Sequence, residues 1–186
     1  MPGSVIICPV GPIDKWILEH IAESISTRFG LSCKVSSRIE NPKYAYDDTR
    51  CQYNSKQILK HLLQQCTRDT LRIIGVTPVD LYVPILKFVF GLAQIEGQCS
   101  IISLYRLYPQ FYDQPSNSDL LLSRVEKTAL HELGHTFGMT HCRDRRCIMY
   151  SSTRIEDTDL KLPDFCSTCF DLFQWLLNKT LMQSSE

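Results

Sequence analysis

The stretch HELGHTFGMTH, from His131 to His141, is the most informative part of the sequence, and the rest of the chain is expected to position it. On a helix, residues four positions apart share a face, with Cβ atoms about 5–6 Å apart, so His131 and His135 can direct their imidazoles at one metal ion. Gly138 tolerates a positive φ and lets the chain leave the helix sharply, which would return His141 to the same ion. Glu132, one step round from His131, is thereby placed beside the metal.

The complete pattern H-E-x-x-H-x-x-G-x-x-H is typical of zinc metallopeptidases. The short H-E-x-x-H arises by chance in long chains, but the glycine and the third histidine at these offsets argue against a surface helix that merely carries histidines. We expect zinc on His131, His135 and His141, with one position left for a water whose pKa falls to about 7. Glu132 would take the proton of this zinc-bound water during attack on the scissile carbonyl and donate it to the leaving amine.

The helix that carries the motif is expected to begin at Asp119 or Ser123, where Ser123 and Glu126 fit a capping box. At 100° per residue, the apolar positions fall in one arc and the two motif histidines nearly opposite. This arc consists of Ala129, Leu130, Leu133 and Phe137. The helix should therefore bury one side in the core and present the other to a cleft.

Four cysteines follow the motif. Cys142 and Cys147 form a C-x-x-x-x-C pair, and Cys166 and Cys169 a C-x-x-C pair, separated by residues 148–165. This spacing predicts a closed, tetrahedral, structural zinc site. A redox pair, disulfides and four unrelated core cysteines are the alternatives; no thioredoxin-like unit surrounds the C-x-x-C, and a reducing compartment disfavours disulfides. Because successive side chains of an extended chain point to opposite faces, His141 and Cys142 should face different metals.

Length and composition favour one domain, residues 1–186, large enough for a proper core. Twenty basic and twenty acidic residues balance to zero net charge, so no basic field recruits nucleic acid. The start, MPGSVIICPVG, is not typical of a signal peptide, and no apolar stretch approaches the ~20 residues of a membrane helix. We expect a cytoplasmic monomer without nucleic-acid or membrane partners. The dispersed cysteines are mostly expected as small buried hydrophobes: Cys8, Cys33, Cys51, Cys66 and Cys99.

Upstream of the motif, strands and helices are expected to alternate. Residues 5–10, 31–36, 71–76, 87–93 and 100–106 read as strands, and 87–93, which Gly91 interrupts, as an edge strand. Helices are expected from an apolar stripe in residues 13–29 that includes Trp16, and in residues 55–66, capped by Asn54 or Ser55. Residues 41–54 and 108–117 are expected as loops and 183–186 as a frayed end. This order favours an α/β fold, a sheet covered by helices.

Residues 131–169 resemble the archaemetzincins, a cytosolic branch of the metzincin zinc metallopeptidases. The resemblance lies in HELGHTFGMTH followed by Cys142, Cys147, Met149 and FCSTC, and less specifically in GVTPVDLY, FVFG and SLYRL upstream. It implies two zinc ions, one catalytic on three histidines and one structural on four cysteines. It also implies a twisted mixed sheet of about five strands with flanking helices, an N-terminal subdomain in residues 1–138, and a small C-terminal subdomain in residues 139–186.

The same resemblance suggests further roles. Met149 matches the methionine turn that floors the metal site in metzincins, and a peptide substrate would pair with the edge strand in residues 87–93. Tyr150 would assist the oxyanion or line a substrate pocket, unless it only packs. Two rival functions remain open: a zinc-built interaction or metal-binding module with little or no peptidase activity, and a redox-responsive zinc protein. Glu132 argues against the first, because a merely structural metal site needs no glutamate there.

Overall fold

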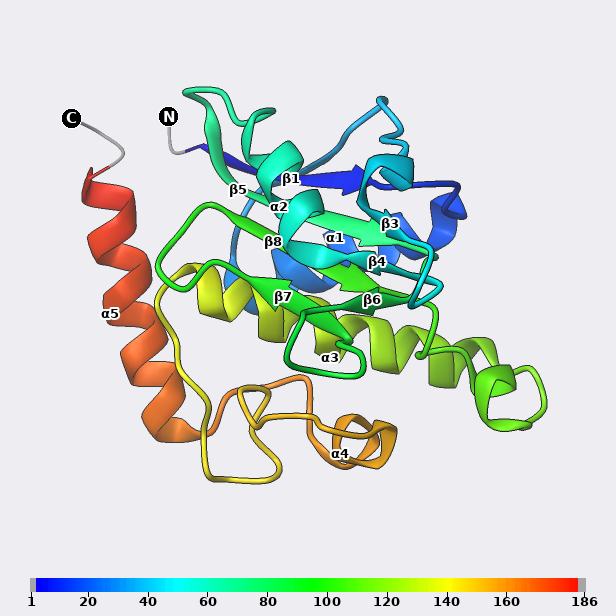
Figure 1. Cartoon of the computed structure of the whole chain (residues 1–186). Helices are drawn as coiled ribbons and strands as arrows, with labels where there is room; N and C mark the ends of the chain where they lie inside the picture. Colours follow the sequence, from blue (N-terminus) through cyan, green and yellow to red (C-terminus); the bar gives the residue numbers. More distant parts are fainter. Residues whose placement is uncertain (1–2, 184–186) are drawn as a thin grey trace.

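A five-stranded mixed sheet, in the order β2-β1-β5-β8-β7, forms the centre of the computed structural model, which describes residues 3–183 (Figure 1). Its strands are β1 (Ser4–Pro9), β2 (Cys33–Val35), β5 (Thr70–Thr77), β7 (Gly91–Ala93) and β8 (Cys99–Ser103). All neighbours are parallel except β7, which runs antiparallel to β8 at the edge. The expected α/β fold with a mixed sheet of five strands is confirmed.

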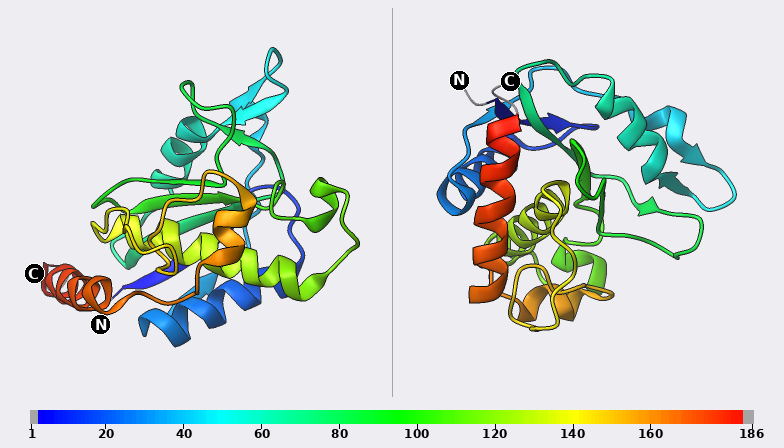
Figure 2. Two further views of the ribbon diagram at one scale, coloured as in Figure 1. Left: turned by 90° about the horizontal axis from the view of Figure 1, so that it is seen from below. Right: turned by 90° about the vertical axis from the view of Figure 1, so that its left-hand side faces the viewer.

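Helices cover both faces of this sheet. α1 (Lys15–Phe29) and α3 (Ser118–Thr136) lie on one face, and α2 (Ser55–Leu63) lies on the other (Figure 2). Every residue of β5 is buried, as expected for a central parallel strand that is covered on both sides. α1 ends at Gly30, whose φ of +67° is readily available to glycine. Helix α3 thus lies directly beneath the edge formed by β8 and β7.

The last part of the chain contains two helices, α4 (Ile155–Leu160) and α5 (Ser167–Gln183). α5 runs along one side of the molecule and buries Phe173, Leu176 and Leu177 in the core that α1 and α3 share (Figure 1). Gln183 ends α5, and residues 184–186 of the expected frayed end lie outside the described residues. No helix within residues 3–183 is both long and apolar enough to cross a membrane.

Residues 41–54 are more ordered than a loop. They contain a 3-10 helix (Pro42–Ala45) and strands β3 (Tyr46–Asp47) and β4 (Gln52–Asn54), which form a second, three-stranded sheet with β6 (Leu81–Tyr82). Distant residues hold this sheet, for example through the bond from the Tyr53 N–H to the Asp80 carbonyl, 2.9 Å. A second 3-10 helix (Pro109–Tyr112) interrupts the loop expected in residues 108–117. Local sequence patterns do not reveal strand pairings between segments that are far apart in the chain.

Some expected boundaries were wrong. α3 begins after Asn117, whose side chain accepts a hydrogen bond from the Leu120 N–H at 2.9 Å, so Asp119 and Ser123 lie inside the helix and form no capping box. The Asn117 carboxamide is an effective cap and starts the helix earlier. Of the strand expected in residues 87–93, only Gly91–Ala93 pairs as β7, at the sheet edge as expected. Trp16 is 42% exposed, outside the apolar stripe of α1.

Candidate active site and cysteine cluster

Helix α3 and the turn after it bring the three motif histidines together. His131 and His135 lie one turn apart on α3, and Gly138 reverses the chain with a φ of +101°. His141 then returns to them, so that one ligand atom from each histidine lies within 4.8 Å of the others. The three ring centroids are 4.6–5.3 Å apart. The structure therefore assembles the predicted trio at one point.

Backbone carbonyls fix the orientation of two of these rings. Nδ1 of His131 lies 2.8 Å from the Ile148 carbonyl oxygen, and Nδ1 of His135 lies 2.7 Å from that of Met139. Each Nδ1–H donates to its carbonyl, which leaves each Nε2 with a lone pair. The two Nε2 atoms are 3.1 Å apart. Two lone pairs at this separation repel each other unless a cation lies between them, so the donor set fits a metal ion.

Burial also favours the neutral form of the three histidines, which is the form that binds metal ions. Desolvation lowers the pKa of His131, His135 and His141 below the usual value for histidine, and the nearby Lys161 ammonium lowers each pKa further. All three imidazoles are therefore neutral near pH 7, as metal binding requires.

Met149 lies directly against the helix turn that carries the histidines. It is fully buried, and a Cβ added to Gly134 would come within 2.7 Å of the Met149 sulfur. Gly134 immediately precedes His135, so the absence of a side chain at this position lets the methionine approach the helix backbone. The same segment supplies the Ile148 carbonyl that orients His131.

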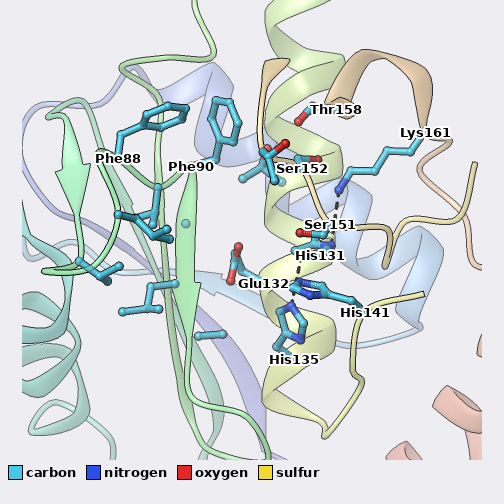
Figure 3. Close-up of a pocket in the computed structure, with 18 of the residues that line it drawn as sticks. Phe88, Phe90, His131, Glu132, His135, His141, Ser151, Ser152, Thr158 and Lys161 are labelled. Carbon is cyan, nitrogen blue, oxygen red and sulfur yellow. Dashed lines mark hydrogen bonds between the residues drawn. The ribbon is translucent and has the colours of Figure 1, made fainter. Parts of the chain in front are cut away.

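The carboxylate of Glu132 lies between α3 and strand β7 (Figure 3). A Cβ added to Gly91 on β7 would come within 2.6 Å of Glu132 Cγ and 2.8 Å of Oε1. Burial raises the pKa of Glu132 to about 8, and the positive charge of Lys161 opposes this rise. Sequence reasoning placed Glu132 beside the metal but gave no sign that a glycine on the edge strand makes room for it.

A cavity of about 500 Å³ opens beside the histidines. Apolar side chains from the segment before and within β7 line one wall, including Phe88 and Phe90, and polar side chains of α3 and the segment after Met149 line the opposite wall (Figure 3). These polar residues include Thr128, Ser151, Ser152, Thr158 and Lys161.

Two predicted site features have different positions relative to this cavity. The edge strand β7 lines it, and the pairing of a peptide substrate with this strand stays a prediction. Tyr150 is not among its lining residues, whereas Ser151 and Ser152 are. The Tyr150 carbonyl instead accepts a hydrogen bond from the Lys161 ammonium at 3.0 Å. The oxyanion and pocket roles of Tyr150 stay predictions.

Lys161 is a charged lining residue that sequence reasoning missed. Its side chain is buried, with 2% of the residue exposed, and its Nζ lies 3.4 Å from Nδ1 of His131. Desolvation lowers its pKa to about 8, an effect that the charge of Glu132 opposes. No motif spacing marks a lysine thirty residues after the first histidine, because only the path of the chain through α4 brings it back.

The four cysteines of the second cluster also converge. Their sulfur atoms all lie within 4.8 Å of one another, and the Sγ atoms of Cys142 and Cys166 are 3.8 Å apart. A tetrahedron with metal–sulfur distances of about 2.3 Å has sulfur–sulfur edges of about 3.8 Å, and a disulfide requires about 2.05 Å. Among residues 3–183, all nine cysteines are free. The cluster therefore has the dimensions of a four-thiolate zinc site.

Backbone N–H groups donate hydrogen bonds to sulfur atoms of this cluster. The Asp144 N–H donates to Sγ of Cys142 and the Cys166 N–H to Sγ of Cys147, each at 3.4 Å. Cys166 directly precedes α5, and the backbone N–H of Cys169 lowers the pKa of its thiol. His141 and Cys142 are consecutive yet belong to different clusters, as predicted. Of the five dispersed cysteines, Cys8 and Cys99 are buried as expected, whereas Cys51 is exposed.

Comparison with known proteins gives a consistent result. The model of peptidase family M54 matches residues 15–175. The archaemetzincin of Methanocaldococcus jannaschii is 41% identical over 170 residues, covering 91% of this chain and 92% of the relative. The crystal structure of archaemetzincin from Methanopyrus kandleri superposes with a TM-score of 0.83 at 34% identity, covering 95% and 96% of the two chains. A zinc-dependent peptidase from Methanocorpusculum labreanum gives a TM-score of 0.82 at 27% identity, covering 91% and 100%.

Proposed function

We propose residue roles for this chain on the premise that it belongs to the archaemetzincins, the zinc metallopeptidases of peptidase family M54. The chain is accordingly a zinc-dependent peptidase that acts on peptides or proteins. Its histidine trio and separate four-cysteine cluster are compatible with one catalytic and one structural zinc. Different residues serve metal binding, proton transfer and substrate binding.

His131, His135 and His141 hold the catalytic zinc in this proposal. The observation that carries the function is the convergence of two Nε2 lone pairs at 3.1 Å on the helix that also presents Glu132 to the cavity. When bound, zinc polarises the scissile carbonyl and makes water acidic enough to react near neutral pH. The carbonyls of Ile148 and Met139 keep both imidazoles in the correct tautomer throughout.

Glu132 is the general base and then the general acid. An Oε atom takes a proton from the attacking water, and the same carboxyl group delivers it to the nitrogen of the leaving amine. The buried position of Glu132 between α3 and β7 limits access of bulk water to this proton. A purely structural metal site would not require a buried carboxylate at this place.

The edge strand β7 binds the substrate backbone. Within the described chain, β7 pairs on one side with β8 and is the last strand of its sheet. A free strand edge presents unpaired N–H and C=O groups that an extended peptide can pair with. The cavity beside β7 then receives one side chain of the peptide, next to the bond that is cleaved.

The four cysteines hold the structural zinc and fix the loop that returns His141. The Cys142 N–H donates to the Met149 carbonyl at 2.9 Å, which ties the segment after His141 to the methionine turn. Residues 139–186 would then act as a small subdomain completing the site that residues 1–138 begin. Free cysteines throughout residues 3–183 support a reducing, cytoplasmic location, and we propose that the chain works there as a monomer.

The decisive experiment compares the zinc-loaded protein with Glu132→Gln on a quenched-fluorescent peptide library. The variant should keep two zinc ions per chain by metal analysis and lose peptide cleavage, because glutamine preserves shape but cannot take a proton. Equal turnover by both proteins would remove Glu132 from the mechanism. Two bound zincs without cleavage by the wild type would favour a zinc-built interaction module.

A further inference from the structure

Among the residues that the structure describes, Lys161 is a buried cation without an ion-pair partner. Lysines that are this buried are normally matched by a carboxylate. In residues 3–183, no carboxylate oxygen lies within 4.0 Å of Lys161 Nζ, although Glu132 lies near enough to interact with it electrostatically. The ammonium donates one hydrogen bond, to the Tyr150 carbonyl. His131 Nδ1, 3.4 Å away, already donates its own proton to Ile148 and so cannot accept another.

Two N–H groups of this ammonium are thus left without an acceptor from the described chain, beside the cavity. Lys161 lines the cavity, and Figure 3 shows its side chain reaching from the wall opposite Phe88 and Phe90 toward His131. The Ser152 hydroxyl, on the same wall, is buried and has no hydrogen-bond partner within residues 3–183. Thr158 adds a further hydroxyl group to this wall. Hydrogen-bond donors therefore gather at this side, and Glu132 is the acidic residue that lines the cavity.

The wall that carries Lys161 is held in place by its own contacts. The guanidinium of Arg124, which is 1% exposed, donates to both carboxylate oxygens of Asp159 at 2.7 and 2.8 Å. Lys127 on α3 donates to the Asp159 carbonyl at 3.2 Å. At the other end of α4, the Asp157 carboxylate accepts from the N–H groups of Thr153 and Arg154. Lys161 follows α4 directly, so its position is fixed before a substrate arrives.

We infer that Lys161 determines specificity by binding a carboxylate of the substrate close to the scissile bond. This inference rests on the proposed peptidase function and names a substrate class for it: peptides with an acidic residue, Asp or Glu, flanking the cleaved bond. The free carboxylate at a peptide C-terminus has the same chemistry and is the second source. In either case the buried ammonium gains a direct ion-pair partner, which residues 3–183 do not provide.

Peptide pairs that differ only in charge test the inference. Quenched-fluorescent peptides carry Glu or Gln on either side of the scissile bond, and a third pair has a free or an amidated C-terminus. The wild type should cleave the acidic member of one pair with a kcat/KM about tenfold to a hundredfold higher. The pair that shows the difference identifies the source of the carboxylate.

Variants of Lys161 test whether this residue causes the preference for acidic peptides. Lys161→Met should bring the acid-to-amide ratio to about one, because it removes the charge and keeps the volume. Lys60→Met, which removes an exposed lysine on α2 outside the cavity, is the control for loss of one positive charge and should keep the wild-type ratio. If Lys161→Met lowers cleavage of every peptide by one factor and leaves the ratio unchanged, Lys161 positions the catalytic groups and the inference is wrong. An absence of acid preference in the wild type would also overturn it.

Binding measurements separate this inference from the proposed function. Fluorescence anisotropy with the zinc-loaded Glu132→Gln protein compares the affinities for the same peptide pairs, whether or not the wild type cleaves them. Acidic members should bind more tightly, and adding Lys161→Met should abolish that difference. If Lys161→Met does not fold, Ser152→Ala decides instead. It removes a hydroxyl without a partner in the described chain, should leave the melting temperature unchanged and should lower the acid preference about threefold; an unchanged preference would contradict the inference.

Discussion

Gly91 on the edge strand lies against the carboxylate of Glu132 so closely that a Cβ there would be 2.8 Å from Oε1. The edge strand and the proposed general base therefore fit closely against each other, although forty residues separate Gly91 from Glu132 in the chain. Because the φ of Gly91 is not positive, a side chain at this position is excluded by contact with Glu132 and not by backbone strain.

Gly91→Ala should lower kcat/KM about tenfold to a hundredfold while both zinc ions stay bound. The added methyl group must push Glu132 aside, and displacement of a catalytic group by about 1 Å has effects of this size. Steady-state kinetics and metal analysis check the prediction. In a Glu132→Gln background the same substitution should cost little more, since the displaced base is already absent; a full further loss there would mean that Gly91 acts on something else.

Cys166→Ser should reduce the bound zinc from two ions to one per chain and lower the melting temperature. The loss of one thiolate opens a closed four-ligand site, and structural zinc contributes directly to folding. Catalytic-zinc affinity should also fall, because Cys142 neighbours His141. Cys51→Ser is the control, since Cys51 is exposed and lies outside the cluster. A stable, fully active Cys166→Ser protein with two zincs would refute the coupling.

Gly138→Ala should destabilise the fold by about 1–2 kcal/mol and weaken catalytic-zinc binding. Its φ of +101° is unfavourable for an L-residue, and relief of that strain would move both His141 and the Met139 carbonyl that orients His135. Denaturant unfolding and competition with a zinc chelator measure the two effects. Gly30→Ala is the matched control: its φ of +67° is also positive, but no described atom would lie within 4 Å of the added Cβ and it ends α1, so zinc affinity should not change.

Arg124→Met should lower the free energy of unfolding by about 2–3 kcal/mol. The substitution leaves the Leu107 carbonyl and the Asp159 carboxylate without their donor. This expected loss is smaller than the full cost of breaking a buried ion pair, because the Asp159 side chain is 35% exposed and water can replace part of the interaction. Denaturant titration measures the loss, and a change of less than about 0.5 kcal/mol would show that α4 does not depend on this contact.

Much of the site could be predicted because its ligands are close in sequence. The spacing of His131, Glu132 and His135 follows from helix geometry alone, and the positive φ at Gly138 follows from the need to turn toward His141. Both cysteine pairs are local patterns as well. The start of α3 was predicted less well, since several residues near Asn117 can cap a helix and the choice depends on the final packing.

The sequence by itself therefore determined the candidate donor atoms and their division into two clusters, because both depend on covalent spacing and helix periodicity. Only the tertiary structure decided which carbonyls orient His131 and His135, how Gly91 makes room for Glu132, and where Lys161 lies. These are contacts between segments whose separation along the chain carries no periodic signal. The distinction has a physical basis: one helix face can bring candidate metal ligands together, but the cavity beside them forms only when the edge strand, α3 and α4 pack together.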